Sequence, residues 1–227
     1  MTSCARWSCF IYILLLCLIG LAPPSQNRSR AQVIEAATQL SELEWTAVPG
    51  SDKASCLHPP AYSGPRYVSD YHSGQEVIGM PYDWGGMDSP SRFLTRLQSG
   101  RFGAGSHKEH ECSGCKSHCT VGIDCSGLVS YCWGLSRHYG TAEIAQFAKP
   151  APESFDVFKD LKPGDALNRP GVHIVLFAGY NEKGQPLVYE AAGKPISRVV
   201  KRPHAWADLE GYSPLLYRDG PPNPLSN

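Results

Sequence analysis

The segment VGIDCSGLVSYCWGL, residues 121–135, contains two of the nine cysteines of this chain and predicts a helix that starts at the first of them. Its apolar residues recur every third or fourth position, which is the spacing of one helical face. These residues are Cys125, Leu128, Val129, Cys132 and Trp133. Asp124 directly precedes the pattern and can cap the helix. The segment therefore places Cys125 in the first turn of a helix.

That position suits a reactive thiol. Free backbone N–H groups and the helix dipole converge at a helix N-terminus and favour a thiolate, which is the nucleophilic form of cysteine. Gly127 has no side chain, so another segment or a substrate can approach closely there. The alternative is that Cys125 is an ordinary buried helical cysteine, which is the interpretation we adopt for Cys132.

Working outward, the upstream sequence predicts two more helices. The segment SRAQVIEAATQLSELEW has an apolar face of about four turns, formed by Val33, Ala36, Ala37, Leu40 and Leu43. A second helix is expected over residues 91–98, where Asp88 or Ser89 can cap and Pro90 suits the first turn. Residues 49–75 are rich in Pro, Gly, Ser and Tyr and are expected to form a long ordered loop.

Downstream of Asp165 the pattern changes to short apolar runs typical of strands. VHIVLFAGYNEKGQPLVYEAAG predicts a hairpin that turns at Asn181–Gly184, and ISRVVKR and SPLLYRD are further strand candidates. Helices come first and strands afterwards. This order indicates an α+β fold with helices packed against a central antiparallel sheet.

The hairpin also brings a base toward a carboxylate. His173 starts its first strand, where it could face the helix that carries Cys125. Glu190 lies on the same sheet face, directly opposite or diagonal depending on the turn, and could orient the imidazole. Each residue also has an ordinary interpretation: His173 as a satisfied core histidine and Glu190 as an edge carboxylate.

Composition excludes some classes of function. The chain has 227 residues, 42% of them hydrophobic, which is enough for one globular domain. Its 21 basic residues balance 21 acidic ones without a block of like charge, so nucleic-acid binding is not expected. We expect no cofactor.

Residues 1–30 have the layout of a signal peptide and a short linker. Arg6 precedes an apolar run from Trp7 to Ala22, which is too short for an ordinary membrane span. Pro23 is a poor cleavage context, so an uncleaved anchor is the alternative, and it would be the chain's membrane contact. Either way, residues 31–227 are expected to form a single exported domain, periplasmic, at the cell surface or secreted.

Five segments together resemble the NlpC family of cell-wall cysteine peptidases. They are GMPYDWGG (79–86), GIDCSGLV (122–129), LKPGDAL (161–167), HIVLFAG (173–179) and VYEAAG (188–193), in the order found in that family. The resemblance covers roughly residues 75–195. It implies a papain-like fold and hydrolysis of amide or isopeptide bonds in peptidoglycan stem peptides or muropeptides, through an acyl-enzyme.

Carried over by position, the resemblance implies Cys125 as nucleophile and His173 as base. Glu190 takes the third polar position, where the family usually has His, Asn or Gln. Tyr82 matches a tyrosine beside the nucleophile that helps to hold the oxyanion, together with the backbone N–H of Cys125.

Three further residues are implied in substrate contact. Asp124 and Ser126 match positions that grip the free amine of the stem peptide in some members, and Trp84 adjoins them. The alternatives are helix capping and turn formation for Asp124 and Ser126, and a packed structural ring for Trp84.

A Cys/His-rich insertion occupies about residues 100–120. His107, His110, Cys112, Cys115, His118 and Cys119 are possible metal ligands, and Cys-x-x-Cys is a ligand spacing. In an exported chain, two disulfides among Cys56, Cys112, Cys115 and Cys119 are favoured over a structural zinc held by Cys112, Cys115, His118 and Cys119. The histidines could also form a solvated loop face, which suits His107 and His110 especially.

Two alternatives to an enzyme stay open. One is a non-catalytic cell-wall-binding or interaction module on the same fold, which the departure at Glu190 and the insertion would fit. The other, a metal-binding loop protein, rests on the Cys/His cluster. The sequence does not indicate an oligomeric state.

Overall fold

The computed structural model describes residues 28–51, 69–107 and 119–218. Residues 1–27 of the predicted leader and linker lie outside these ranges, and so do Cys56, His110, Cys112, Cys115 and His118. The interpretations that rest on those residues stay predictions. In the part of the chain that is described, no helix combines the length and the apolar character needed to cross a membrane.

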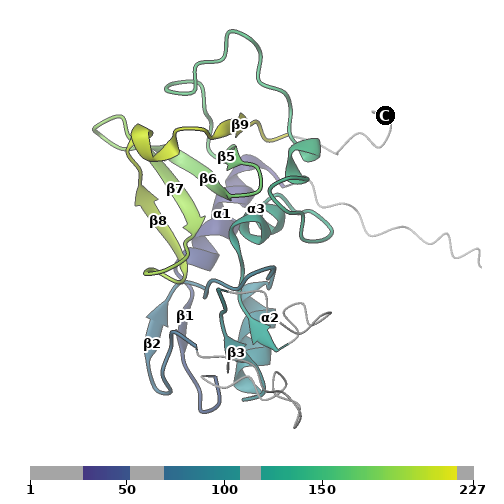
Figure 1. Cartoon of the computed structure of the whole chain (residues 1–227), viewed down its shortest axis with the longest axis vertical. Helices are drawn as coiled ribbons and strands as arrows, with labels where there is room; N and C mark the ends of the chain where they lie inside the picture. The colour runs from purple at the N-terminus through teal and green to yellow at the C-terminus, as the bar shows by residue number, and fades with distance from the viewer. Residues whose placement is uncertain (1–27, 52–68, 108–118, 219–227) are drawn as a thin grey trace, which may run out of the picture.

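The main feature is a five-stranded antiparallel sheet, drawn in green and yellow in the upper part of Figure 1. Its strands are β5 (Ala166–Arg169), β6 (His173–Tyr180), β7 (Pro186–Ala191), β8 (Val199–Pro203) and β9 (Ser213–Leu215). Their spatial order is β8-β7-β6-β5-β9. The predicted hairpin is present as β6 and β7, and the two further strand candidates contribute β8 and β9.

Two helices cover one face of this sheet, α1 (Arg30–Ser41) and α3 (Cys125–Cys132). Strand alternation divides the apolar residues between the faces. Ile174 and Leu176 belong to the large core that includes the helices, whereas Val175 and Phe177 pack in a smaller cluster. The smaller cluster is covered partly by the short 3₁₀ helix Trp206–Leu209.

Helix α1 starts where its sequence can satisfy the first free N–H groups. The Ser29 side chain accepts from the backbone N–H of Gln32, and the Gln32 side chain accepts from the N–H of Ser29, which forms a capping box. Its predicted apolar face is buried, except that Leu43 lies beyond the helix end. The Thr38 and Tyr189 hydroxyls are 2.6 Å apart and join the helix to β7.

A second group of elements lies below the sheet in Figure 1. It consists of the antiparallel pair β1 (Glu44–Thr46) and β2 (Glu76–Ile78), helix α2 (Pro90–Gln98), and the parallel pair β3 (Gly103–Ala104) and β4 (Thr120–Val121). Helix α2 has Ser89 as its N-cap and Pro90 at its first turn, as predicted.

The predicted combination of helices with an antiparallel sheet is therefore present. The expectation that all strands follow the helices is wrong, because β1 to β4 precede α3 along the chain. These strands are two or three residues long. Segments that short are below the length at which a period of two becomes visible.

Candidate active site

Cys125 is the first residue of α3. Asp124 is the N-cap, and its side chain accepts a 2.6 Å hydrogen bond from the backbone N–H of Gly127. The side chain of Cys125 is free of disulfide bonds, and the residue is 7% exposed. The thiol thus lies at the positive end of the helix dipole, beside N–H groups of the first helical turn.

Gly127 permits a close crossing at this turn. A Cβ atom at this position would lie 2.0 Å from the carbonyl oxygen of Gly86, which no real side chain could occupy. On the other side of the same crossing, the N–H of Gly85 donates to the carboxylate of Asp124 over 2.8 Å. The close approach expected at Gly127 is present, and the segment that crosses there is the one that carries Tyr82 and Trp84.

His173 is the first residue of β6, and it lies close enough to Cys125 for the thiol to raise the pKa of its imidazole. Its Nε2 lies 2.9 Å from Oε1 of Glu190. The strand register pairs Leu176 with Tyr189, which makes Glu190 diagonal to His173 rather than directly opposite. The structure therefore brings Cys125, His173 and Glu190 together.

The imidazole of His173 and the carboxylate of Glu190 are both held in their charged forms. Burial alone would lower the pKa of His173, but hydrogen bonds to Cys125 and Glu190 outweigh it and raise this pKa to about 9. Burial alone would raise the pKa of Glu190, but hydrogen bonds from His173, His204 and Arg202 hold it well below its ordinary value. At neutral pH the site contains an imidazolium bound to a carboxylate.

Tyr82 lies next to this group and is buried. Burial raises the pKa of its phenol, and the negative charges of Cys125 and Asp124 raise it further. A phenol that stays protonated is a hydrogen-bond donor. The ring stacks on His107, with centroids 5.0 Å apart and planes 4° from parallel, so one residue of the predicted insertion lies at the site.

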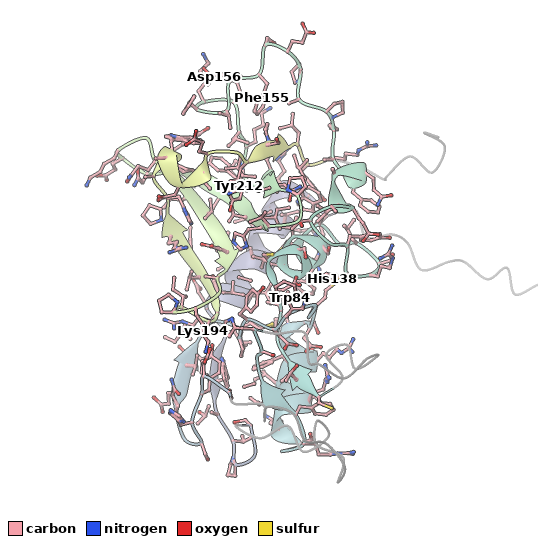
Figure 2. The ribbon with its side chains drawn as sticks, viewed as in Figure 1. Trp84, His138, Phe155, Asp156, Lys194 and Tyr212 are labelled. Carbon is pink, nitrogen blue, oxygen red and sulfur yellow. The ribbon has the colours of Figure 1, made fainter. Side chains whose placement is uncertain are left out.

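Asp124 and Ser126 have a partner that the sequence did not indicate. Nε2 of His138 lies 2.9 and 3.0 Å from the two carboxylate oxygens of Asp124 and 3.2 Å from the Ser126 hydroxyl. Trp84 is 49% exposed, so about half of its side chain is open to solvent. His138 and the backbone of Gly85, which follows Trp84, both contact Asp124, and Figure 2 labels Trp84 and His138.

The second cysteine of α3 differs sharply from the first. Cys132 is fully buried, and burial raises the pKa of its thiol to about 12. It belongs to the large hydrophobic core, as predicted. Of the insertion's cysteines, Cys119 is described and is disulfide-bonded. Within residues 28–51, 69–107 and 119–218, no group of three or more His, Cys, Asp and Glu residues could hold a metal ion.

Three residues around the site were not predicted: His138, Arg202 and His204. Arg202 and His204 both contact Glu190, from β8 and just beyond it. Strand alternation within VVKRP could have placed Arg202 on the same face as Glu190, once β8 was paired with β7. His138 follows α3 in a segment without periodicity, so the sequence carried no signal for it.

A surface groove lies elsewhere on the described part of the chain. It has a volume of about 710 Å³, runs along the outer face of α1 and extends to Pro163 and Ala178. None of the residues that line it is one of the candidate site residues, so the groove and the Cys125 group are separate features.

Comparison with known proteins gives one structural likeness. No protein-family model matches the chain, and no curated protein matches it either. Among solved structures, it is similar to the P60 domain of an antigen from M. avium subspecies paratuberculosis, with 16% sequence identity and a TM-score of 0.38. The match covers 84% of this chain and 93% of the other.

Proposed function

We propose that this protein is an exported cysteine hydrolase that cleaves amide or isopeptide bonds in peptidoglycan stem peptides. The observation that carries the proposal is the contact series from Cys125 through His173 to Glu190 at the start of α3. The substrate class rests on the sequence motifs that resemble NlpC peptidases, and so does a papain-like arrangement of the fold. No cofactor is needed for this chemistry.

In the first half of the reaction, the Cys125 sulfur attacks the substrate carbonyl carbon, and the C=O electron pair moves to the oxygen. The Tyr82 hydroxyl and the N–H of Cys125 donate to that oxyanion. His173 then gives its proton to the leaving nitrogen as the C–N bond breaks, which releases an amine and leaves a thioester on Cys125.

In the second half, water attacks the thioester carbonyl while His173 accepts one of its protons. The C–S bond breaks, the carboxylic acid product departs, and the imidazolium and thiolate are restored. The sum is one amide and one water converted into an acid and an amine. Glu190 stays ionised throughout, because its role is to orient and stabilise the imidazolium.

The proposal is tested by mass spectrometry of products from purified muropeptides, comparing the wild type with Cys125→Ala. We expect the variant to release no fragments while its circular dichroism spectrum stays unchanged. Undiminished turnover by Cys125→Ala would contradict the proposal.

A labelling experiment separates the enzyme from a non-catalytic wall-binding module. Iodoacetamide should alkylate Cys125 in the folded wild type much faster than it alkylates the same thiol in denatured chain. Cys132 is the internal control, because its buried thiol should remain unlabelled until the protein unfolds. Equal rates for folded and denatured Cys125 would favour the binding module.

A further inference from the structure

Glu190 has more partners than a residue that only orients a histidine requires. Its two carboxylate oxygens have different neighbours. Oε1 faces His173, whereas Oε2 is 2.7 Å from both Nε and Nη2 of Arg202 and 3.0 Å from Nε2 of His204. Glu190 is only 5% exposed, so these contacts replace water as its source of hydrogen bonds.

The fold explains how these groups meet. Strands β7 and β8 are paired so that Val188 lies opposite Arg202 and Glu190 lies opposite Val200. Arg202 is therefore a diagonal neighbour of Glu190 on the same sheet face. His204 follows β8, and its backbone N–H donates to the carbonyl of Pro186 over 3.0 Å, which fixes it beside the start of β7.

A buried carboxylate is costly unless it is paired and hydrogen-bonded. His173 gives Glu190 one partner, but that partner changes charge during the proposed reaction. Arginine keeps its charge at every accessible pH and donates from a rigid planar group. Arg202 thus supplies a positive charge that does not vary while His173 loses and regains its proton.

We infer that Arg202 and His204 are positioning residues of the proposed hydrolase, which keep Glu190 ionised and oriented so that it holds His173 toward Cys125. The inference rests on the proposed function, because it assigns these residues a role in that reaction. Neither residue touches the reacting atoms.

Other ionisable groups also face this carboxylate. They are His173 from β6, Cys125 from α3 by way of His173, and Tyr212, which precedes β9. Burial raises the pKa of Tyr212, the charge of Glu190 raises it further, and Arg169 opposes the shift. Tyr212 is therefore neutral at neutral pH, and Arg202 is the fixed positive charge in contact with Glu190.

The sign of the expected pH effect follows from Glu190. The pKa of Glu190 is lower in the folded protein than in an unfolded chain. The carboxylate is therefore fully ionised at its ordinary pKa and loses its charge only in more strongly acidic solution. Without Arg202 this pKa rises, so Glu190 takes up a proton at a higher pH than it does in the wild type. The loss of Cys125 reactivity on acidification should then begin at a higher pH.

The experiment measures the alkylation rate of Cys125 by iodoacetamide from about pH 4.5 to 8.5, a range that spans the ordinary carboxyl and imidazole pKa values. It compares the full-length wild type with Arg202→Met, Arg202→Lys, Glu190→Gln and the double variant Glu190→Gln/Arg202→Met. This readout needs no peptidoglycan. Lys201→Met is the matched control, since Lys201 is the preceding cation on β8, and its ammonium lies over the Tyr189 ring and not at Glu190.

For Arg202→Met we expect a rate loss of about tenfold near pH 5 and about threefold or less near pH 8. Arg202→Lys should fall between it and the wild type. The double variant should match Glu190→Gln within about twofold, because a neutral carboxamide no longer needs the arginine. Lys201→Met should follow the wild-type profile, and His204→Gln should show a loss in the same direction as Arg202→Met.

Two results would overturn the inference while leaving the proposed function intact: an Arg202→Met profile that coincides with the wild type, or single-variant effects that multiply in the double variant. A wild-type Cys125 that reacts no faster than a denatured-chain thiol would remove both the function and the inference. If Arg202→Met does not fold, the comparison of the double variant with Glu190→Gln, together with Arg202→Lys, decides the question.

Discussion

Two buried carboxylates near Cys125, Glu190 and Asp83, are held in opposite states. Glu190 is 5% exposed and Asp83 is 1% exposed, so burial alone does not distinguish them. Three side chains donate to Glu190, and its pKa is lowered. Neither oxygen of Asp83 has a hydrogen-bond partner among the described residues, and burial raises its pKa to about 8.

The comparison shows that donors, rather than depth, decide which acid carries a charge. Thr120 lies close enough to oppose the shift at Asp83, but its hydroxyl does not reach it with hydrogen-bond geometry. At neutral pH, Asp83, which lies between Tyr82 and Trp84 in the sequence, is therefore an uncharged acid. Glu190, which contacts His173, thus has three donors, whereas Asp83 has none among the described residues and lies near the negative charges of Asp88 and Asp124.

Replacing the carboxyl group by a carboxamide should impair the protein at Glu190 and stabilise it at Asp83. Glu190→Gln removes the charge that stabilises the imidazolium of His173, so we expect kcat/KM for muropeptide cleavage to fall on the order of 100-fold. The wild type should lose activity as the pH rises through about 9, the pKa of His173. In the variant this limb should move down toward the ordinary histidine pKa of about 6.5.

The measurement is a pH profile of kcat/KM for both proteins. Because the change is nearly isosteric, the thermal unfolding curve serves as the folding control. An unchanged alkaline limb in Glu190→Gln would show that the carboxylate does not act on His173, and the contrast with Asp83 would lose its meaning.

Asp83→Asn should instead stabilise the protein at neutral and alkaline pH. A raised pKa means that wild-type stability is full below the ordinary carboxyl pKa and is lost as the pH rises from about 4 to about 8. The variant has no such loss, so we expect a gain on the order of 2 kcal/mol at pH 8 that shrinks to nothing near pH 4. Urea unfolding at several pH values measures it, and a gain independent of pH would contradict the assignment of Asp83 as a neutral acid.

The smallest effect is expected at a third buried carboxylate, remote from Cys125. Asp165 accepts from Arg30 over 2.9 Å and from the backbone N–H groups of Lys162 and Tyr217 over 2.8 Å each. Arg30→Met removes the pair with Asp165 and the Arg30 hydrogen bonds to the carbonyls of Pro163 and Tyr217, which should cost about 1 kcal/mol of stability because the guanidinium is partly exposed. The alkylation rate of Cys125 should not change. If the alkylation rate does change, then removing a hydrogen-bond donor from any buried carboxylate affects Cys125, and the effect is not specific to Glu190.

Local features of the fold could be predicted from the sequence, because short-range patterns determine them. The cap at Ser89 with Pro90 set the start of α2, and the apolar spacing set α3 from its first residue. Likewise, the turn between β6 and β7 followed from Asn181 to Gly184. The contact between Cys125 and His173 could be anticipated only because both lie at the ends of predictable elements.

Contacts set by the order of strands could not be predicted in the same way. That β8 borders β7 is a property of the whole sheet, so the sequence did not connect Arg202 to Glu190. His138 reaches Asp124 from an irregular segment, and no periodic pattern records such a contact. The state of Asp83 depends on the absence of donors around it, which only a three-dimensional arrangement reveals.

The crossing at Gly127 has a mechanical consequence. The carbonyl of Gly86 packs against the first turn of α3, and Asp124 accepts a hydrogen bond from the neighbouring N–H of Gly85. These two contacts fix the segment that carries Tyr82 and Trp84 to the helix that carries Cys125. Any side chain at position 127 would push the Gly86 carbonyl away from α3, and with it the backbone segment that holds Tyr82 and Trp84 beside the start of the helix.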